Sequence, residues 1–284
     1  MTASFWILRC QAPDRIGILA AVAGVLSGLR LNVLESHDFG DRETSTFFIR
    51  AAFEAEAGFD RSAFEAAFEP VARGFEMDWS LRAGTDRPKA AILVSKSDHC
   101  LNDLLYRHLR GRLGADIASV ISNHEDARWL ADRHDVPYHH IPVTKETKPA
   151  AEEAMLCVLE ESGADIVILA RYMQVLSPDL TAKLSGRCIN IHHSFLPSFK
   201  GARPYHQAHA RGVKLVGATA HYVTSDLDEG PIISQEAVPV DHRMTPERLV
   251  ALGRDVEARV LARAVTAHAE GRVFSNGNRT VVFE

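Results

Sequence analysis

An amide and an imidazole two positions apart, at the end of an apolar segment, are the side chains of this sequence best suited to chemistry. Asn190 and His192 alternate with Ile189 and Ile191 after Gly186, a pattern typical of the end of a buried strand. Residues two apart on an extended chain point to the same side, so the pair could hold a developing oxyanion. The alternative is a polar loop that caps the strand, with one histidine satisfied in the core.

A second stretch, residues 221–231, supplies the carboxylate that acid/base chemistry on a carbonyl would need. Its sequence predicts a strand that runs into an acidic turn, with Asp226, Asp228 or Glu229 near the end of that strand. Pro197 is expected to prevent a helix from starting directly after the first strand. An open α/β sheet places its ligand site at such strand ends, so the sequence predicts one site from both stretches.

These two stretches also resemble a known family. The motif NIHHSFLPSFKGARPYHQA, followed by HYVTSDLDEGPII, resembles the folate-dependent formyltransferase superfamily over residues 89–284. The resemblance implies a Rossmann-like domain with a mostly parallel sheet. It also implies that Asn190, His192 and Asp228 are the catalytic residues. As a separate hypothesis, we expect that no metal takes part.

Residues 170–176 form an apolar stretch outside any strand, which could make a flat slot for a heterocycle. The alternative is core packing under a loop, since methionine commonly fills gaps in a core. The resemblance implies that this stretch and the acidic turn line a pterin pocket, and His193 could hydrogen-bond the attacking water. The substrate-binding residues implied in this way are Met173, Gln174, Val175, Leu176, Thr224 and His193.

The loop at residues 95–100 contains no glycine, which argues against a dinucleotide or phosphate site, where backbone N–H groups must approach the phosphate. In this respect the sequence departs from the glycinamide ribonucleotide enzymes, which typically carry glycine in this loop. Lys96, Asp98, His99 and Cys100 are expected to fill the space that a phosphate would occupy.

Within the superfamily, this loop, His193 and the N-terminal segment resemble the formyltetrahydrofolate deformylases. The implied reaction is 10-formyltetrahydrofolate plus water giving formate and tetrahydrofolate, which would supply formate for purine biosynthesis and balance folate pools. The folate is then the substrate, and no cofactor is expected. The alternatives are formyl transfer to a small amine, or a folate or amino-acid sensor without catalysis.

The first 84 residues predict a ferredoxin-like unit of the order βαββαβ. The expected strands are residues 5–10, 31–39, 46–53 and 76–82, with helices at 18–29 and 59–73 and a turn at 11–17. This segment resembles an ACT domain, which implies dimerisation and an amino-acid effector near Asp14 to Ile18. A unit that pairs without binding an effector is the alternative. We expect a homodimer or homotetramer.

Residues 85–284 follow a polar linker at 84–88 and alternate strands with helices. The pattern predicts a doubly wound, largely parallel sheet with hairpin strands at one end. The expected strands lie at 90–95, 117–122, 138–143, 165–170, around 188, 215–223 and 232–238. The expected helices lie at 101–113, 126–133, 149–162, 178–184, 205–211 and 246–269.

Composition limits the class of protein. The chain has 284 residues, 46% of them hydrophobic and 24% charged, with a net charge of −5 and no basic run, so no nucleic-acid or membrane partner is expected. The four cysteines lack CxxC spacing and no secretory signal is evident, which favours the cytoplasm. His192, His193, His206 and His209 could be read as metal ligands, but carboxylate and cysteine partners are missing nearby.

Overall fold

The computed structural model describes residues 4–56, 58–196 and 204–284, so Pro197 lies outside the described residues. The chain divides into two compact units. Unit 1 comprises Met1–Arg87, Gly271–Asn276 and Val281–Glu284, and unit 2 comprises Pro88–Glu270 and Gly277–Thr280. The first stretch of unit 1 ends at Arg87, within the polar linker expected at residues 84–88, and segments near the end of the chain are divided between the two units.

Unit 1 contains the expected βαββαβ order, which is confirmed. Its antiparallel sheet has the strand order β2-β3-β1-β4, formed by β1 (Ser4–Pro13), β2 (Asn32–Asp41), β3 (Thr46–Ala55) and β4 (Asp78–Ala83). The helices are α1 (Ile18–Gly28) and α2 (Arg61–Gly74). Apolar residues at helical spacing, such as Val22 and Leu26 of α1 and Phe64 and Phe68 of α2, pack in the core with Leu8 of β1.

Two local features of unit 1 differ from expectation. Strand β1 continues to Pro13, which pairs with Thr46, so residues 11–13 are strand rather than turn. The chain also ends in a hairpin that was not predicted, formed by β12 (Val273–Asn276) and β13 (Arg279–Val282). Phe274 packs against Phe48 of β3, which explains why this part of the chain belongs to unit 1.

Unit 2 has the predicted α/β architecture with a seven-stranded sheet of the order β11-β10-β9-β8-β5-β6-β7. The pairs among β5 to β9 are parallel, and β10 and β11 form the antiparallel end. The strands are β5 (Lys89–Val94), β6 (Asp116–Ser122), β7 (Tyr138–His140), β8 (Ile166–Leu169), β9 (Cys188–His192), β10 (Leu215–Tyr222) and β11 (Ile232–Pro239). The central strands are almost continuously apolar, as parallel strands covered on both faces must be.

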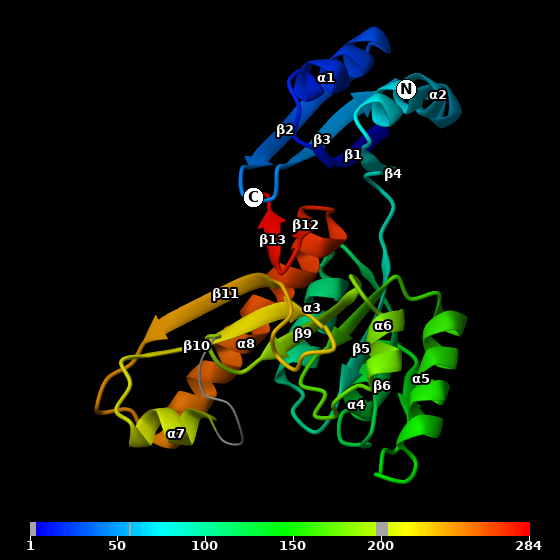
Figure 1. Cartoon of the computed structure of the whole chain (residues 1–284). Coiled ribbons are helices and arrows are strands. Elements are labelled where there is room, and N and C mark those ends of the chain that lie inside the picture. Colours follow the sequence, from blue (N-terminus) through cyan, green and yellow to red (C-terminus); the bar gives the residue numbers. More distant parts are fainter. Residues whose placement is uncertain (1–3, 57, 197–203) are drawn as a thin grey trace. The chain divides into compact units, whose positions relative to one another are not determined.

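Helices cover this sheet, as Figure 1 shows. They are α3 (His99–Leu109), α4 (Arg128–Arg133), α5 (Lys148–Ser162), α6 (Pro178–Lys183), α7 (Pro204–Ala210) and α8 (Pro246–Ala269). The long helix α8 begins at an N-cap, Thr245, whose side chain accepts from the N–H of Arg248. It packs against β9, β10, β11 and α3, so its side chains contact the strand that carries Asn190 and His192.

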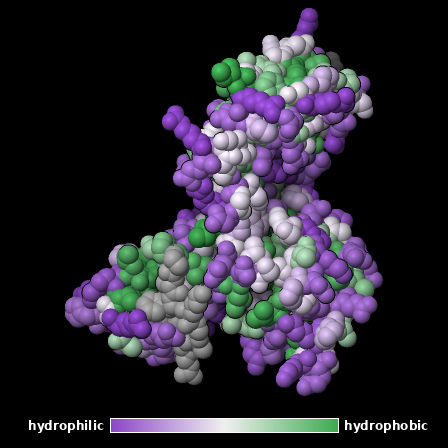
Figure 2. Space-filling model, in the orientation of Figure 1, coloured by the Kyte–Doolittle hydropathy of each residue, from purple (hydrophilic) through white to green (hydrophobic). Residues whose placement is uncertain are grey.

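Surface hydrophobicity is unevenly distributed over unit 1. On the face seen in Figure 2, hydrophobic surface lies over α1, and Ile16 and Leu19 are exposed. The edge strand β2 also exposes Val33, Leu34 and Phe39. Within the described parts of the chain, no helix combines the length and apolar character needed to cross a membrane.

Candidate active site

Strand β9 carries Asn190 and His192 into the middle of the sheet. It pairs with β8 on one side and with the antiparallel β10 on the other, where Asn190 lies opposite His221 and His192 lies opposite Thr219. Both side chains therefore face the same side of one strand. His192 is buried, with 7% of its surface exposed, and Asn190 is half-buried.

Asp228 reaches this pair through a tight turn. Because β10 is antiparallel, its last residue, Tyr222, lies beside Ile189 rather than beside His192. The turn must therefore fold back along the sheet to reach His192. The sequence had predicted only that the carboxylate lies near the end of the strand. Asp228 adopts a left-handed backbone with φ of 59°, and a Cβ at Gly230 would overlap the carbonyl oxygen of Tyr222. Only glycine permits this close approach of the turn to β10.

Asp228 and His192 form the central contact of the site. The Nδ1 atom of His192 lies 3.2 Å from Oδ1 of Asp228, whereas Nε2 of His221 lies 3.8 Å from the same oxygen. The hydrogen bond with His192 outweighs partial burial and holds the pKa of Asp228 well below its usual range. The carboxylate is therefore ionised at neutral pH. The Nε2 atom of His192 is buried and has no protein partner.

His221 fixes the amide of Asn190. Its Nδ1 lies 2.9 Å from the carbonyl oxygen of Tyr222, so this nitrogen must carry the proton that it donates. In the neutral ring, Nε2 is then an acceptor, and Nδ2 of Asn190 lies 3.2 Å away. One amide hydrogen is thus held by His221, which orients the other for a substrate oxygen.

The segment after β9 is held by a buried hydroxyl. Oγ1 of Thr219 donates to the carbonyl oxygen of Ser194 at 3.0 Å and accepts from the N–H of Leu196 at 3.1 Å. His193 lies in this segment, with its ring centroid 4.9 Å from that of His192. Burial, together with the charge of Arg171, lowers the pKa of His193 to about 4. His193 is therefore neutral at physiological pH.

A cavity of about 290 Å³ opens beside these groups. Its wall includes every residue expected to be catalytic or to bind substrate: Asn190, His192, Asp228, Met173, Gln174, Val175, Leu176, Thr224 and His193. Asp226 also lines it. The two interpretations of residues 170–176 each apply to part of the stretch. Tyr172 and Leu176 join the core, whereas Met173 and Val175 are exposed at the cavity.

The loop at residues 95–100 supports this apolar wall. Oγ of the buried Ser95 donates to Oδ1 of Asn123 at 2.7 Å and accepts from the N–H of Met173 at 2.9 Å. Lys96 is exposed and so does not fill a phosphate pocket as expected, whereas Cys100 is buried. The loop therefore holds the apolar wall in place through its hydroxyl.

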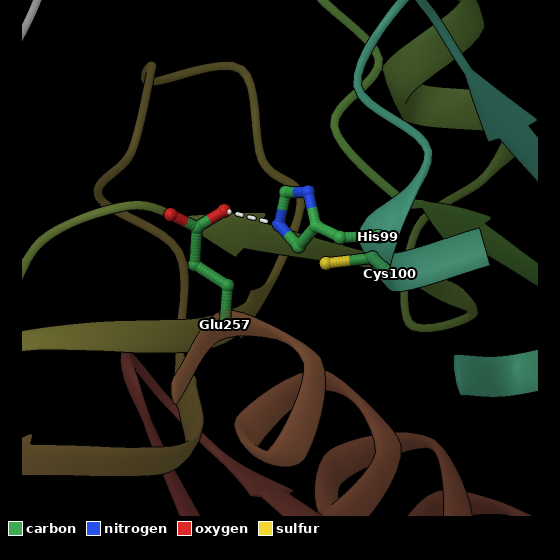
Figure 3. A group of neighbouring side chains, drawn as sticks. All are labelled: His99, Cys100 and Glu257. Atoms are coloured by element: carbon green, nitrogen blue, oxygen red, sulfur yellow. Dashed lines mark hydrogen bonds and ion pairs between the residues drawn. The ribbon is translucent and has the colours of Figure 1, made fainter. Parts of the chain in front are cut away.

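Among the described residues, one group has the composition of a metal site. It consists of His99, Cys100 and Glu257, whose candidate ligand atoms lie within 4.8 Å of one another (Figure 3). None of the four histidines considered from the sequence belongs to it. Glu257 is already engaged by His99 at 2.9 Å and by the hydroxyl of Tyr205 at 2.7 Å. Burial raises the pKa of the Cys100 thiol well above its usual value, which disfavours the thiolate that a metal needs.

Sequence reasoning did not select His221, Arg171 or Glu257. The register of an antiparallel pair, which no local pattern reveals, places His221 opposite Asn190. Glu257 had a usable signal, because it follows Val256 on an apolar face of a long helix and only 1% of it is exposed. A carboxylate in such a position requires partners.

Known proteins of similar sequence and structure point to one family. A family model described as formyl transferase matches residues 88–265. The chain is 51% identical over 277 residues to a formyltetrahydrofolate deformylase of Corynebacterium sp. (strain P-1), covering 97% of each protein. It is similar to the solved structure of a formyltetrahydrofolate deformylase from Burkholderia mallei ATCC 23344, with 53% identity, a TM-score of 0.95, and coverage of 99% of this chain and 100% of that chain. Glycinamide ribonucleotide transformylase 1 from Symbiobacterium toebii shows 34% identity and a TM-score of 0.66, covering 72% of this chain and 98% of that chain.

Proposed function

The chain belongs to the formyltetrahydrofolate deformylase family, and from this premise we propose that Asn190, His192 and Asp228 hydrolyse the formyl group of 10-formyltetrahydrofolate. The products are formate, which would supply purine biosynthesis, and tetrahydrofolate. The observation that carries the proposal is the contact of 3.2 Å between His192 and Asp228. It leaves Nε2 of a buried imidazole unpartnered in the wall of a cavity that also contains Asn190.

The reaction divides among these three residues. The oxygen of water bonds to the formyl carbon, and the ionised Asp228 accepts the proton that water loses. The amide of Asn190 donates to the oxyanion that forms. Nε2 of His192 lies in the same cavity wall and donates to the oxyanion when the ring carries both protons. The bond between carbon and N10 then breaks, and the proton is passed to N10. Formic acid loses its remaining proton, so one formamide and one water give one amine, one formate and one proton.

The cavity wall accounts for the folate. Met173 and Val175 expose apolar surface next to the polar groups of the turn that carries Thr224 and Asp228. An apolar wall with a few fixed polar groups suits a flat heterocycle that carries hydrogen-bonding edges. The neutral His193 can accept a hydrogen bond from the attacking water. We assign the folate the role of substrate and propose no additional cofactor.

Formate release in the absence of any amine tests this proposal. Purified protein is mixed with 10-formyltetrahydrofolate, and formate is quantified with and without the protein. An Asp228→Asn variant serves as the matched control, because it keeps the shape of the side chain and removes the base. Wild-type protein that releases no formate above the background would refute the hydrolase proposal.

Transfer of the formyl group to an amine is the rival reaction, favoured by the likeness to the glycinamide ribonucleotide transformylase. The loop at residues 95–100 offers no glycine for a phosphate. We therefore expect that glycinamide ribonucleotide neither accepts the formyl group nor slows formate release. A formylated ribonucleotide product from the wild-type protein would leave transfer as the function to pursue.

We further propose that unit 1 is an ACT-like module that pairs with a second copy, giving a homodimer or homotetramer in the cytoplasm. The edge strand β2 and its exposed Leu34 support pairing, since unpaired edges are commonly covered. An amino-acid effector near Asp14 to Ile18 is part of the same proposal. Leu34→Lys should reduce the mass measured by light scattering while Leu109→Lys, at an exposed position of unit 2, should not. An unchanged mass for the Leu34 variant would contradict pairing through β2.

A further inference from the structure

A buried carboxylate, Glu257, organises groups that the hydrolysis described above does not use. Glu257 of α8 contacts His99 of α3 (Figure 3). It also accepts a hydrogen bond from the hydroxyl of Tyr205 of α7. The Nε atom of Arg171 lies 3.4 Å from its Oε2. Burial opposes ionisation, but the hydrogen bond with His99 and the charge of Arg171 outweigh it and lower the pKa of Glu257. The carboxylate is therefore a fixed negative charge that anchors the guanidinium of Arg171.

Arg171 itself occupies an unfavourable backbone conformation. Its φ is 65°, in the left-handed region where glycine is comfortable and a long side chain is strained. Residues held in such regions cluster at functional sites, because the surrounding structure must compensate for the strain. The strain is therefore an independent indication that the side chain at this position has a use.

Arg171 also lines the cavity that contains His192 and Asp228. Among the described residues that line this cavity, Arg171 is the sole lysine or arginine. Its Nε has no hydrogen-bond partner, and within the described chain Glu257 is the sole carboxylate at ion-pair distance from it. A guanidinium has five donors, so Arg171 retains the capacity to bind an anion.

Hydrolysis creates an anion in this cavity. The substrate formamide is neutral, whereas the product formate carries a charge next to the ionised Asp228. Like charges in a partly buried site repel each other, so the product requires a neighbouring cation. A carboxylate matches the planar fork of a guanidinium, which can donate two parallel hydrogen bonds.

We propose that Arg171, anchored by Glu257, forms a subsite for the formate anion as it leaves Asp228. This inference rests on the proposed hydrolysis and adds to it the residue that handles the product. Glu257 is a positioning residue in this arrangement, since its charge holds the guanidinium in place.

The backbone conformation of Arg171 makes a clean test possible. Arg171→Gly removes the guanidinium and relieves the left-handed strain, which offsets part of the cost of leaving the buried Glu257 without this cation. The melting temperature of the variant shows that it is folded. Arg171→Lys keeps the charge but loses the fork. Asp135→Gly is the matched control, because Asp135 also has a left-handed φ of 55° but is exposed and lies outside the residues that line the cavity.

Two measurements are made on each full-length variant: inhibition of turnover by added sodium formate, and line broadening of ¹³C-formate in the presence of tetrahydrofolate. Loss of hydrogen bonds to a charged group should weaken formate binding roughly ten- to hundredfold in Arg171→Gly. Arg171→Lys should lie between it and the wild type, and Asp135→Gly should equal the wild type.

The outcomes separate this inference from the proposed function. Unchanged formate binding by a folded Arg171→Gly variant, with formate production intact in the wild type, would overturn the subsite alone. A wild-type protein that produces no formate would overturn the hydrolysis, and the subsite with it.

Discussion

Replacing His221 with phenylalanine should slow formate release by removing the support of Asn190, although His221 touches no reacting atom in the proposed mechanism. Phenylalanine keeps a planar ring in this buried position and removes both nitrogens. The amide of Asn190 then loses the acceptor at 3.2 Å that fixes its orientation. Its remaining hydrogen is no longer held toward the substrate oxygen.

The expected size follows from the kind of contact that is lost. One net hydrogen bond contributes about 0.5–1.5 kcal/mol, so a fully expressed loss of orientation would lower the rate by up to about tenfold. Removal of the donor itself, in Asn190→Ala, should cost roughly 10²–10³ in kcat. Because His221 acts through Asn190, the double variant should be no slower than Asn190→Ala alone.

The assay is single-turnover formate release at saturating 10-formyltetrahydrofolate for the wild type, both single variants and the double variant. Tyr222→Phe is the matched control, since it removes a hydroxyl on the adjacent residue and keeps the carbonyl that accepts from His221. Its rate should equal that of the wild type. Rate losses that multiply in the double variant would show that His221 acts independently of Asn190 and would refute the positioning argument. Asp228, 3.8 Å from Nε2 of His221, would then be the group to examine.

Four further outcomes are expected. Asp228→Asn should abolish turnover but retain folate binding, as measured by calorimetry. Glu229 lies outside the cavity wall, so Glu229→Gln should stay active. An active Asp228→Asn variant together with an inactive Glu229→Gln variant would exclude Asp228 as the base. The pKa of His193 falls from 6.5 to about 4 on folding, so between these pH values the unfolded chain binds more protons and the free energy of unfolding rises with pH. His193→Gln should reduce this rise, as measured by urea unfolding at several pH values. An unchanged dependence of the unfolding free energy on pH would contradict this prediction. Gly230→Ala should lower both melting temperature and kcat, because its Cβ would overlap the carbonyl oxygen of Tyr222; a fully stable variant would contradict this. Dialysis against a chelator should leave activity intact, and activity that is lost and then restored by zinc would overturn the absence of a metal.

Hydrophobic periodicity was enough to predict most of the fold. The strands of unit 2 from β5 to β9 are short apolar segments between helical stretches, and the alternation itself implies parallel pairing. The C-terminal hairpin was missed although it has a local signal. Gly277 and Asn278 separate β12 from β13, and Gly277 has a φ of 63°. A glycine–asparagine pair between two short apolar runs is a hairpin signal.

The site could be anticipated only where its residues lie close together in the sequence. Asn190 and His192 share one strand, so the alternation of side chains predicted that they point to one side. The choice of Asp228 over Asp226 and Glu229 came from the family resemblance, because composition gives three equivalent carboxylates in one turn. Arg171 and Glu257 meet only in the folded unit, through the packing of α8 under the sheet. No local pattern encodes that contact.

The same packing bears on the choice between water and an amine as the acceptor of the formyl group. A phosphorylated amine would need an anion site at the start of a helix such as α3. Here the first residue of α3, His99, donates to Oε2 of Glu257 at 2.9 Å, so the chain places a carboxylate of its own at that position. A phosphate would have to displace this carboxylate or lie beside it, and like charges in a buried setting repel each other. The internal ion pair therefore disfavours a phosphorylated acceptor, while it leaves water free to approach the formyl carbon beside Asp228.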